Sequence, residues 1–259
     1  REDGAAPTAA AISPDGRFVA YATTQRVWLR RLSEAGASAV SGSDEPRSVL
    51  WSPDSAWLGF QAQGQLWKVP VMSDSAPVAV ARVPADFTQL GGATWLPDGR
   101  IMFVTGSSGL YEVSSTGGEA RLVLDVDAGK DADFHHVSAL PGGRSVVFVT
   151  HPTDASAPYV LEVFDGSTRR SLLEGDGIAT PQYASSGHLL YATARGLWAV
   201  PFDVSDPRLA GEPVLLQADV YSPSVAADGT LVLLPAALGP QQQVVWLERS
   251  GLSGEPLSP

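Results

Sequence analysis

The sequence predicts an all-β fold: a six-bladed β-propeller of four-stranded antiparallel blades, closed without strand exchange between the termini. Two observations carry this prediction. A short turn element recurs six times at a nearly constant spacing, and the segments between the turns are apolar runs of strand length. The 26 Gly and 20 Pro residues of the 259-residue chain leave no uninterrupted stretch of helical length.

The recurring turn has the pattern Ser-Pro-Asp-Gly or a variant of it, at residues 13–16, 52–55, 96–99, 140–143, 184–187 and 226–229. Its third residue falls at positions 15, 54, 98, 142, 186 and 228, so the successive spacings are 39, 44, 44, 44 and 42. Pro presets the backbone of such a turn, Asp accepts backbone hydrogen bonds, and Gly adopts a positive φ. A period of roughly 40–45 residues is typical of a four-stranded propeller blade.

Each repeat is expected to contribute an inner strand before the turn and three strands after it. The first strand after the turn is almost continuously apolar, as expected between two neighbouring blades, at residues 18–21, 57–60, 101–104, 146–149, 189–191 and 231–234. The next strand carries an aromatic residue, at 27–29, 66–69, 110–113, 159–161, 197–200 and 245–247. A more polar outer strand ends the unit, as at 120–124 and 212–216, because an edge strand tolerates Pro and charge.

The inner strands show an alternation of their own. The position three residues before the third residue of each turn is mostly large and apolar: Ile12, Trp51, Trp95, Ala139, Tyr183 and Val225. One residue earlier lies a smaller and more polar row, Ala11, Leu50, Thr94, Ser138, Gln182 and Ser224. Such alternation is typical of a strand with one face against the next blade. A β-sandwich would give no reason for one four-strand unit to repeat at constant period.

The repeat divides one domain of residues 1–259 into blades at about 5–43, 44–84, 85–130, 131–176, 177–219 and 220–259. The first unit begins with an inner strand at about residues 5–13, and the last ends with an outer strand at about 254–259. We therefore expect every repeat to supply all four strands of its own blade, in the same order. Side-chain packing between the first and the last blade would then close the ring.

Composition excludes several classes of function. The formal net charge is −11, with 17 basic residues against 28 acidic ones, so a nucleic-acid partner is not expected. The absence of Cys excludes disulfides, thiolate catalysis and Cys-ligated metals. No apolar run approaches the roughly 18 residues of a membrane span.

The mouth of the central channel is the expected binding surface. Each repeat has one residue seven positions before the third residue of its turn, at the start of the inner strand. These equivalent residues are Thr8, Arg47, Gly91, His135, Ala179 and Tyr221. Arg47, His135 and Tyr221 would give varied polar chemistry on a rigid frame, and His136 and Gln182 are the other candidate ligand-binding residues. The alternative is that all of them are ordinary loop residues.

Metal binding is not expected from the histidine pair His135-His136. Adjacent strand residues point to opposite faces, so the two cannot easily bind one ion, and a packed or hydrogen-bonded histidine is favoured.

An acidic stretch just before that pair contains Asp125, Asp127, Asp131 and Asp133. Oxygen-rich loops can hold Ca²⁺, but Gly129 occupies the place of an expected third ligand, so a solvated connection between blades is favoured. We expect no metal and no cofactor.

No catalytic constellation stands out either. There is no Gly-x-Ser-x-Gly elbow, the serines fall in turns, and no pair of carboxylates is singled out for glycoside cleavage. The sequence therefore predicts a protein that is not an enzyme.

The turn, the apolar strand and the aromatic strand together resemble the TolB-like propellers, whose repeats are related to the WD-type repeat. Four segments are also similar to the propellers that follow a membrane span in some bacterial serine/threonine kinases: Gly-His-Leu-Leu-Tyr at 187–191, Leu-Trp-Ala-Val-Pro-Phe-Asp at 197–203, Leu-Ala-Gly-Glu-Pro-Val at 209–214 and Val-Trp-Leu-Glu-Arg-Ser-Gly at 245–251. In that family further blades often follow the last segment. No kinase signature is present in these residues.

The resemblance implies a monomeric, non-catalytic module outside the bacterial cytoplasm, in the periplasm or at the cell surface. It would bind a protein, peptide or small ligand through its channel face, as a sensor or scaffold. Two other possibilities stay open. One is an accessory gating propeller of a prolyl-oligopeptidase-like hydrolase whose catalytic domain is not in these residues. The other is a lyase or hydrolase that uses the channel directly.

Overall fold

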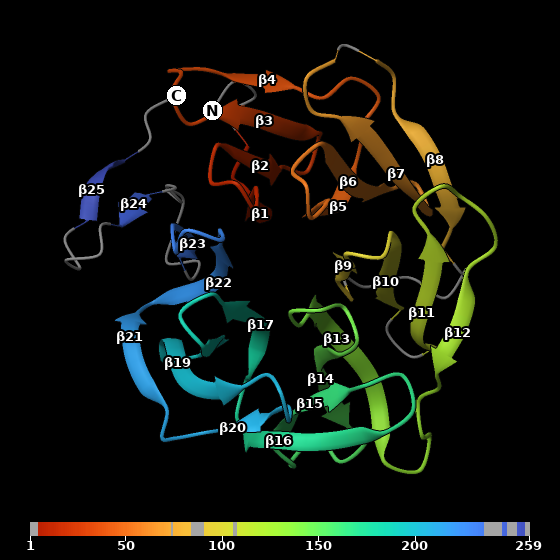
Figure 1. Cartoon of the computed structure of the whole chain (residues 1–259), viewed down its shortest axis with the longest axis vertical. Helices are drawn as coiled ribbons and strands as arrows, with labels where there is room; N and C mark the ends of the chain where they lie inside the picture. Colours follow the sequence, from red (N-terminus) through yellow and green to blue (C-terminus); the bar gives the residue numbers. More distant parts are fainter. Residues whose placement is uncertain are drawn as a thin grey trace.

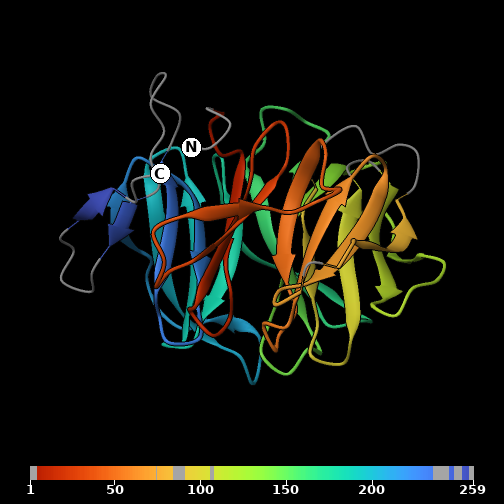
Figure 2. The ribbon, with the colours of Figure 1, turned by 90° about the horizontal axis from the view of Figure 1, so that it is seen from above.

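Antiparallel β-sheets arranged around a central channel make up the computed structural model, which describes residues 5–73, 75–83, 91–105, 108–235, 245–247 and 253–256 (Figure 1). The described residues contain twenty-five strands and no α-helix. The strands form six sheets, each built from strands consecutive in the sequence. Seen from the side, the sheets stand next to one another around the ring (Figure 2). The predicted all-β propeller of antiparallel four-stranded blades is confirmed at this level.

The strands of the first three sheets follow in chain order. The first sheet contains β1 (Ala9–Ile12), β2 (Phe18–Ala22), β3 (Val27–Arg31) and β4 (Ala37–Ala39). The second contains β5 (Pro46–Trp51), β6 (Trp57–Ala62), β7 (Gln65–Pro70) and β8 (Val78–Arg82). The third contains β9 (Ala93–Trp95), β10 (Arg100–Thr105), β11 (Gly109–Ser114) and β12 (Arg121–Leu124).

The other three sheets continue the ring. The fourth contains β13 (Asp131–Ala139), β14 (Val146–Pro152), β15 (Tyr159–Phe164) and β16 (Arg169–Gly175). The fifth contains β17 (Ala179–Ala184), β18 (His188–Thr193), β19 (Gly196–Asp203), β20 (Arg208–Leu209) and β21 (Val214–Ala218). The sixth contains β22 (Val220–Val225), β23 (Leu231–Pro235), β24 (Val245–Leu247) and β25 (Ser253–Pro256). The expected outer strand at 254–259 is thus β25, and residues 257–259 lie outside the described residues.

The expectation of six four-stranded blades is met by five sheets and is wrong for the fifth. Five sheets have four strands, whereas the fifth has five, because its outer strand is split into β20 and β21, which both pair with β19. Pro201 within β19 and Pro213 just before β21 each lack a backbone N–H. A continuous ladder cannot form across them, so the chain pairs once on either side of the two prolines.

All six predicted turns form with the same hydrogen bond. In each copy the N–H of the fourth residue donates to the carbonyl of the first, over 2.9–3.1 Å. The fourth residue has a positive φ in every copy, which Gly supplies in five of them. The second copy has Ser55 there, at φ 59°, and its Oγ accepts the N–H of Asp15 from the neighbouring sheet at 3.1 Å. That contact between sheets offers a reason for a serine in a glycine position.

The hydrophobic core lies between the sheets. The buried residues form six clusters, and each cluster combines residues of two neighbouring sheets. The apolar strands β2, β6, β10, β14, β18 and β23 supply residues to clusters on both sides, which explains their almost continuous hydrophobic runs. The smallest cluster, Ile12, Val19, Ala226 and Val232, joins the first sheet to the sixth.

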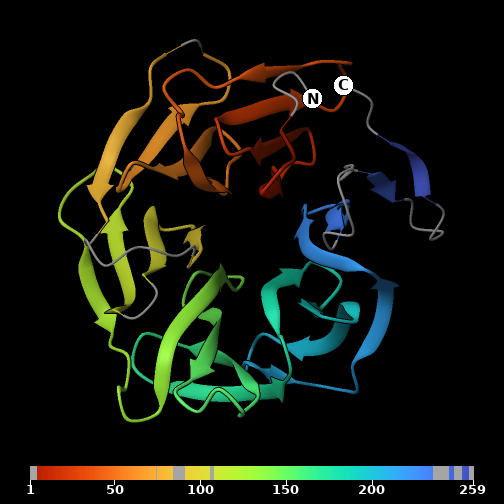
Figure 3. The same ribbon diagram turned by 180° about the vertical axis from the view of Figure 1, so that it is seen from behind.

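The small polar row of the inner strands has a structural role. Three of its side chains accept a backbone N–H from the next sheet around the ring, joining Thr94 to Ala139, Gln182 to Val225 and Ser224 to Ile12 at 3.1, 3.0 and 3.0 Å. Seen from behind, the inner strands lie around the centre of the ring (Figure 3). None of the described residues forms a helix long and apolar enough to cross a membrane.

Candidate functional site

A cavity of about 1000 Å³ occupies the centre of the ring. It is lined by residues of the innermost strand of every sheet, β1, β5, β9, β13, β17 and β22. The five residues predicted as ligand contacts from the repeat register, Arg47, His135, His136, Gln182 and Tyr221, all line it. The structure therefore brings the predicted residues to one surface.

Three of these residues offer different chemistry to the cavity. Arg47 is exposed, and its guanidinium makes no ion pair with any residue that the structure describes. Tyr221 is 54% exposed, which is unusual for a large aromatic residue and leaves its ring accessible. Gln182 is already engaged, since its Oε1 accepts the N–H of Val225.

The entrances of the inner strands are shaped by a repeated bulge. Gly92, His136 and Thr180 have φ values of 99°, 57° and 48° and lie 44 residues apart, in register with the repeat. The pairing of β13 with β14 and of β17 with β18 shifts at these positions. The N–H of His136 donates to the carbonyl of Gly91 in the third sheet. A bulge re-aims the side chains around it, which is frequent beside binding sites.

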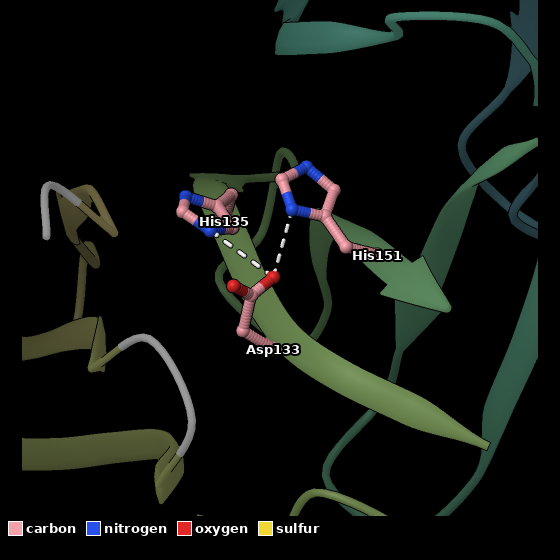
Figure 4. A group of neighbouring side chains, drawn as sticks. All are labelled: Asp133, His135 and His151. Carbon is pink, nitrogen blue, oxygen red and sulfur yellow. Dashed lines mark ion pairs between the residues drawn. The ribbon is translucent and has the colours of Figure 1, made fainter. Parts of the chain in front are cut away.

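Two histidines and one aspartate converge on the wall of this cavity (Figure 4). Asp133 and His135 lie two residues apart on β13, on the same face, and Asp133 is the cross-strand partner of His151 on β14. Oδ1 of Asp133 lies 3.1 Å from Nε2 of His135 and 2.8 Å from Nδ1 of His151. Among the described residues this is the one group of His, Asp and Glu whose ligand atoms could hold a metal ion together.

The surroundings of His136 and His151 lower the pKa values of these two histidines. Burial and the neighbouring His135 lower the pKa of His151, although Asp133 opposes the change. Burial, together with the charges of His135 and His151, lowers the pKa of His136 to about 3. The rings of His135 and His151 are stacked with centroids 4.3 Å apart, and the Tyr159 ring lies 3.9 Å from that of His151. A neutral imidazole has a lone pair, so it can accept a proton or bind a metal.

The acidic stretch before the histidines does not form one site. Asp131 pairs with Arg169, whose Nη1 lies 2.5 Å from Oδ2 of Asp131. Asp127 accepts the N–H of Gly129 and lies 3.6 Å from Lys130 Nζ, and Asp125 accepts the N–H of Val126. Only Asp133 faces the histidines. Among the described residues the four carboxylates therefore do not converge as one group.

Sequence reasoning missed His151 and Tyr159 as residues of the cavity. His151 lies 16 residues after His135, and only the register of β13 against β14 brings them together. One signal was available. The Asp-x-His spacing of residues 133 and 135 puts both side chains on one strand face, and His151 lies two residues after the next predicted strand, 146–149.

No protein-family model and no curated protein matches this sequence. Solved structures do match its fold. The hydrazine synthase of Kuenenia stuttgartiensis matches with a TM-score of 0.68 and 14% identity, over 93% of this chain and 76% of that one. A putative TolB from Agrobacterium tumefaciens matches with a TM-score of 0.63 and 18% identity, over 86% of this chain and 84% of that one.

An oligogalacturonate lyase in complex with manganese also matches, with a TM-score of 0.61 and 13% identity, over 93% of this chain and 77% of that one. At these identities the likeness concerns the fold. The chain is therefore a propeller similar to TolB structures, and the same architecture is found in the two enzymes.

Proposed function

We propose that this chain is a binding module that takes a ligand into its central channel and does not itself catalyse a reaction. The observation that carries the proposal is the cavity of about 1000 Å³ lined by all the inner strands. This size is at the upper end of the range of roughly 300–1000 Å³ that is usual for small-molecule sites. The strands are held by cores on both sides, so the lining is a rigid frame.

The chemistry of the lining favours an anionic ligand with an aromatic or apolar part. Arg47 is an exposed cation of the channel in a chain whose formal net charge is −11. A guanidinium binds carboxylates through paired hydrogen bonds. The accessible Tyr221 ring would cover an apolar part of the same ligand. A peptide segment with a free carboxylate and a small aromatic acid both fit this description.

The setting of this module is part of the same proposal. We infer an extracytoplasmic, monomeric domain of a bacterial protein, either TolB-like or attached to a receptor-like kinase. The likeness to TolB structures supports the first setting. The segments at 187–191, 197–203 and 209–214 are the basis for the second.

Calorimetry of the purified chain tests the binding proposal. The probes are a panel of aromatic carboxylic acids and of short peptides with a free C-terminal carboxylate. We expect at least one to bind with a stoichiometry of one. Arg47→Ala and Tyr221→Ala should each weaken that binding by about tenfold or more. Arg26→Ala is the matched control, because Arg26 is also exposed but does not line the cavity.

Two results would overturn the proposal. One is that no probe of the panel binds the folded chain. The other is that binding survives the double Arg47→Ala, Tyr221→Ala variant with unchanged affinity. Far-UV circular dichroism of each variant separates loss of binding from loss of the fold.

A further inference from the structure

We propose that Asp133, His135 and His151 form a site for a divalent transition-metal ion of the Zn²⁺ class on the wall of the channel. This inference does not depend on the ligand that the channel takes, because it concerns the ion alone.

The strand pairing preorganises the three side chains. Asp133 and His135 share one face of β13, and the ladder places His151 of β14 directly opposite Asp133. Both strands are held by buried apolar residues, among them Phe134 and Phe148, whose rings are 5.0 Å apart. The His135 side chain is only 10% exposed. A site on paired strands keeps its geometry better than one on a loop.

The distances suit a single small cation. The three candidate ligand atoms lie within 4.8 Å of one another, and two of the separations are 3.1 and 2.8 Å. Ligand atoms around a tetrahedral zinc ion, with Zn–N bonds of about 2.0–2.1 Å, are about 3.3 Å apart. A widening of a few tenths of an ångström therefore brings the two distances from Asp133 to the spacing of zinc ligands. The Tyr159 ring, whose centroid lies 3.9 Å from that of His151, limits how His151 can turn away.

Asp133 supplies a second, independent observation. Its Oδ1 is buried and makes no directed hydrogen bond with the residues that the structure describes. Both neighbouring imidazole nitrogens approach this one oxygen atom. The nearby Arg169 is engaged by Asp131 and Glu162, so it does not neutralise Asp133. A buried carboxylate oxygen without a directed donor is costly, and a bound cation would remove that cost.

The donor set selects the class of metal. Two imidazole nitrogens and one carboxylate oxygen suit Zn²⁺, Co²⁺, Ni²⁺ or Cu²⁺ better than Ca²⁺ or Mg²⁺, which prefer six or more oxygens. Three protein ligands leave one position open in a tetrahedral site. Because His135 and His151 line the cavity, that position faces the channel, where water or an anion can occupy it.

The competing explanation is a metal-free cluster in which the histidines donate to Asp133. Zn²⁺ titration of the chelator-treated, tag-free chain separates the two explanations. We expect one Zn²⁺ per chain. Co²⁺ should give visible absorption bands typical of four- or five-coordinate geometry, which Zn²⁺ removes and excess Ca²⁺ does not.

Variants locate the ion. His135→Ala, His151→Ala and Asp133→Asn should each weaken Zn²⁺ binding by more than about tenfold, since each removes a ligand. His188→Ala is the control, because His188 neither lines the cavity nor belongs to the converging group, and the affinity of this variant for Zn²⁺ should stay at the wild-type value.

The proposal fails if the wild-type chain binds no Zn²⁺, whatever the variants do. It also fails if the His135→Ala, His151→Ala double variant, shown to be folded by circular dichroism, keeps wild-type affinity. Should that variant not fold, the conservative Asp133→Asn substitution and the Co²⁺ spectrum of the wild type decide. Bands typical of six-coordinate water ligation, unchanged by the substitution, would overturn the site.

Discussion

The hydroxyl of Ser224 accepts the backbone N–H of Ile12 at 3.0 Å, so a hydrogen bond spanning 212 positions joins the sixth sheet to the first. A second bond runs from the N–H of Ala227 to the carbonyl of Pro14 at 2.9 Å. The apolar cluster at this junction has four buried residues, whereas the cluster between the fourth and fifth sheets has ten. Among the described residues, both polar contacts and a small apolar cluster therefore join the sixth sheet to the first.

Ser224→Ala should destabilise the protein by about 1–3 kcal/mol, because the buried N–H of Ile12 would lose its acceptor. Urea unfolding followed by circular dichroism measures the change. Ser222→Ala on the same strand is the control, since the Ser222 hydroxyl has no hydrogen bond among the described residues and should change stability by less than about 0.5 kcal/mol. Equal effects of the two substitutions would refute the role of Ser224 in closure.

Trp51 joins the first two sheets in a related way. Its indole Nε1–H donates to the carbonyl of Ala11 at 3.0 Å, and its ring lies 6.2 Å from that of Phe18. Trp51→Phe would keep an aromatic ring near Phe18 but leave the carbonyl without its donor, so we expect a loss of about 1 kcal/mol or more. Thermal and urea unfolding measure it. Trp51→Ala, which also removes the packing, should cost about 3–5 kcal/mol. A Trp51→Phe variant as stable as the wild type would mean that only the packing of Trp51 matters.

The periodic features of the fold could be predicted from sequence because their causes are local. Each Pro-Asp-Gly-type turn contains the residues that its backbone conformation requires. Each apolar run is a strand that is buried on both faces. The split of the outer strand into β20 and β21 was not predictable in the same way. It depends on where Pro201 and Pro213 fall in the pairing of β19 with β20 and β21, which is set by the register of these strands.

The site was predictable only in part, for the same reason. The repeat register placed Arg47, His135 and Tyr221 around the channel, since equivalent positions of a repeat occupy equivalent places in the ring. The partnership of His135 with His151 depends on the pairing of β13 with β14, where the register shifts twice. A pattern within one strand cannot reveal a contact that two strands create.

Gly187→Ala tests the turn chemistry. Gly187 has a φ of 81°, and an added Cβ would meet no atom within 4 Å, so the cost of the substitution comes from the backbone alone. We expect a loss of about 1–2 kcal/mol in urea unfolding. Gly36→Ala is the matched control, because its Cβ also enters open space and its φ is not in the left-handed region. Gly36→Ala should be neutral or slightly stabilising; an equal loss at both positions would contradict the assignment of strain to the turn.

Arg169 is the centre of a buried ion-pair network in the fourth sheet. Its guanidinium bonds Asp131 at 2.5 and 2.9 Å and Glu162 at 2.7 Å, and it lies 5.0 Å from the centre of the Phe134 ring. Both carboxylate side chains are only 6% exposed. Arg169→Leu should therefore destabilise the protein by about 3–5 kcal/mol at neutral pH, since it leaves two buried carboxylates without their cation. The neighbouring Arg170→Leu, which breaks an exposed pair with Asp206 and an exposed hydrogen bond to the carbonyl of Pro207, should cost less than about 1 kcal/mol.

The pH dependence of the same variant separates charge from packing. Burial alone would raise the pKa of Asp131, but the bonds from Arg169 outweigh it and hold that pKa below its ordinary value of 3.8. In the wild type, this contribution to stability is present above pH 3.8 and is lost as the pH falls through the lowered folded value. In Arg169→Leu burial is opposed only by the N–H of Asp127 and the charge of Lys130, so Asp131 takes up a proton more readily than in the wild type. Urea unfolding measures how much lower the free energy of unfolding of the variant is than that of the wild type. This difference should be smaller at pH 5 than at pH 7. A difference of equal size at both pH values would assign the loss to packing.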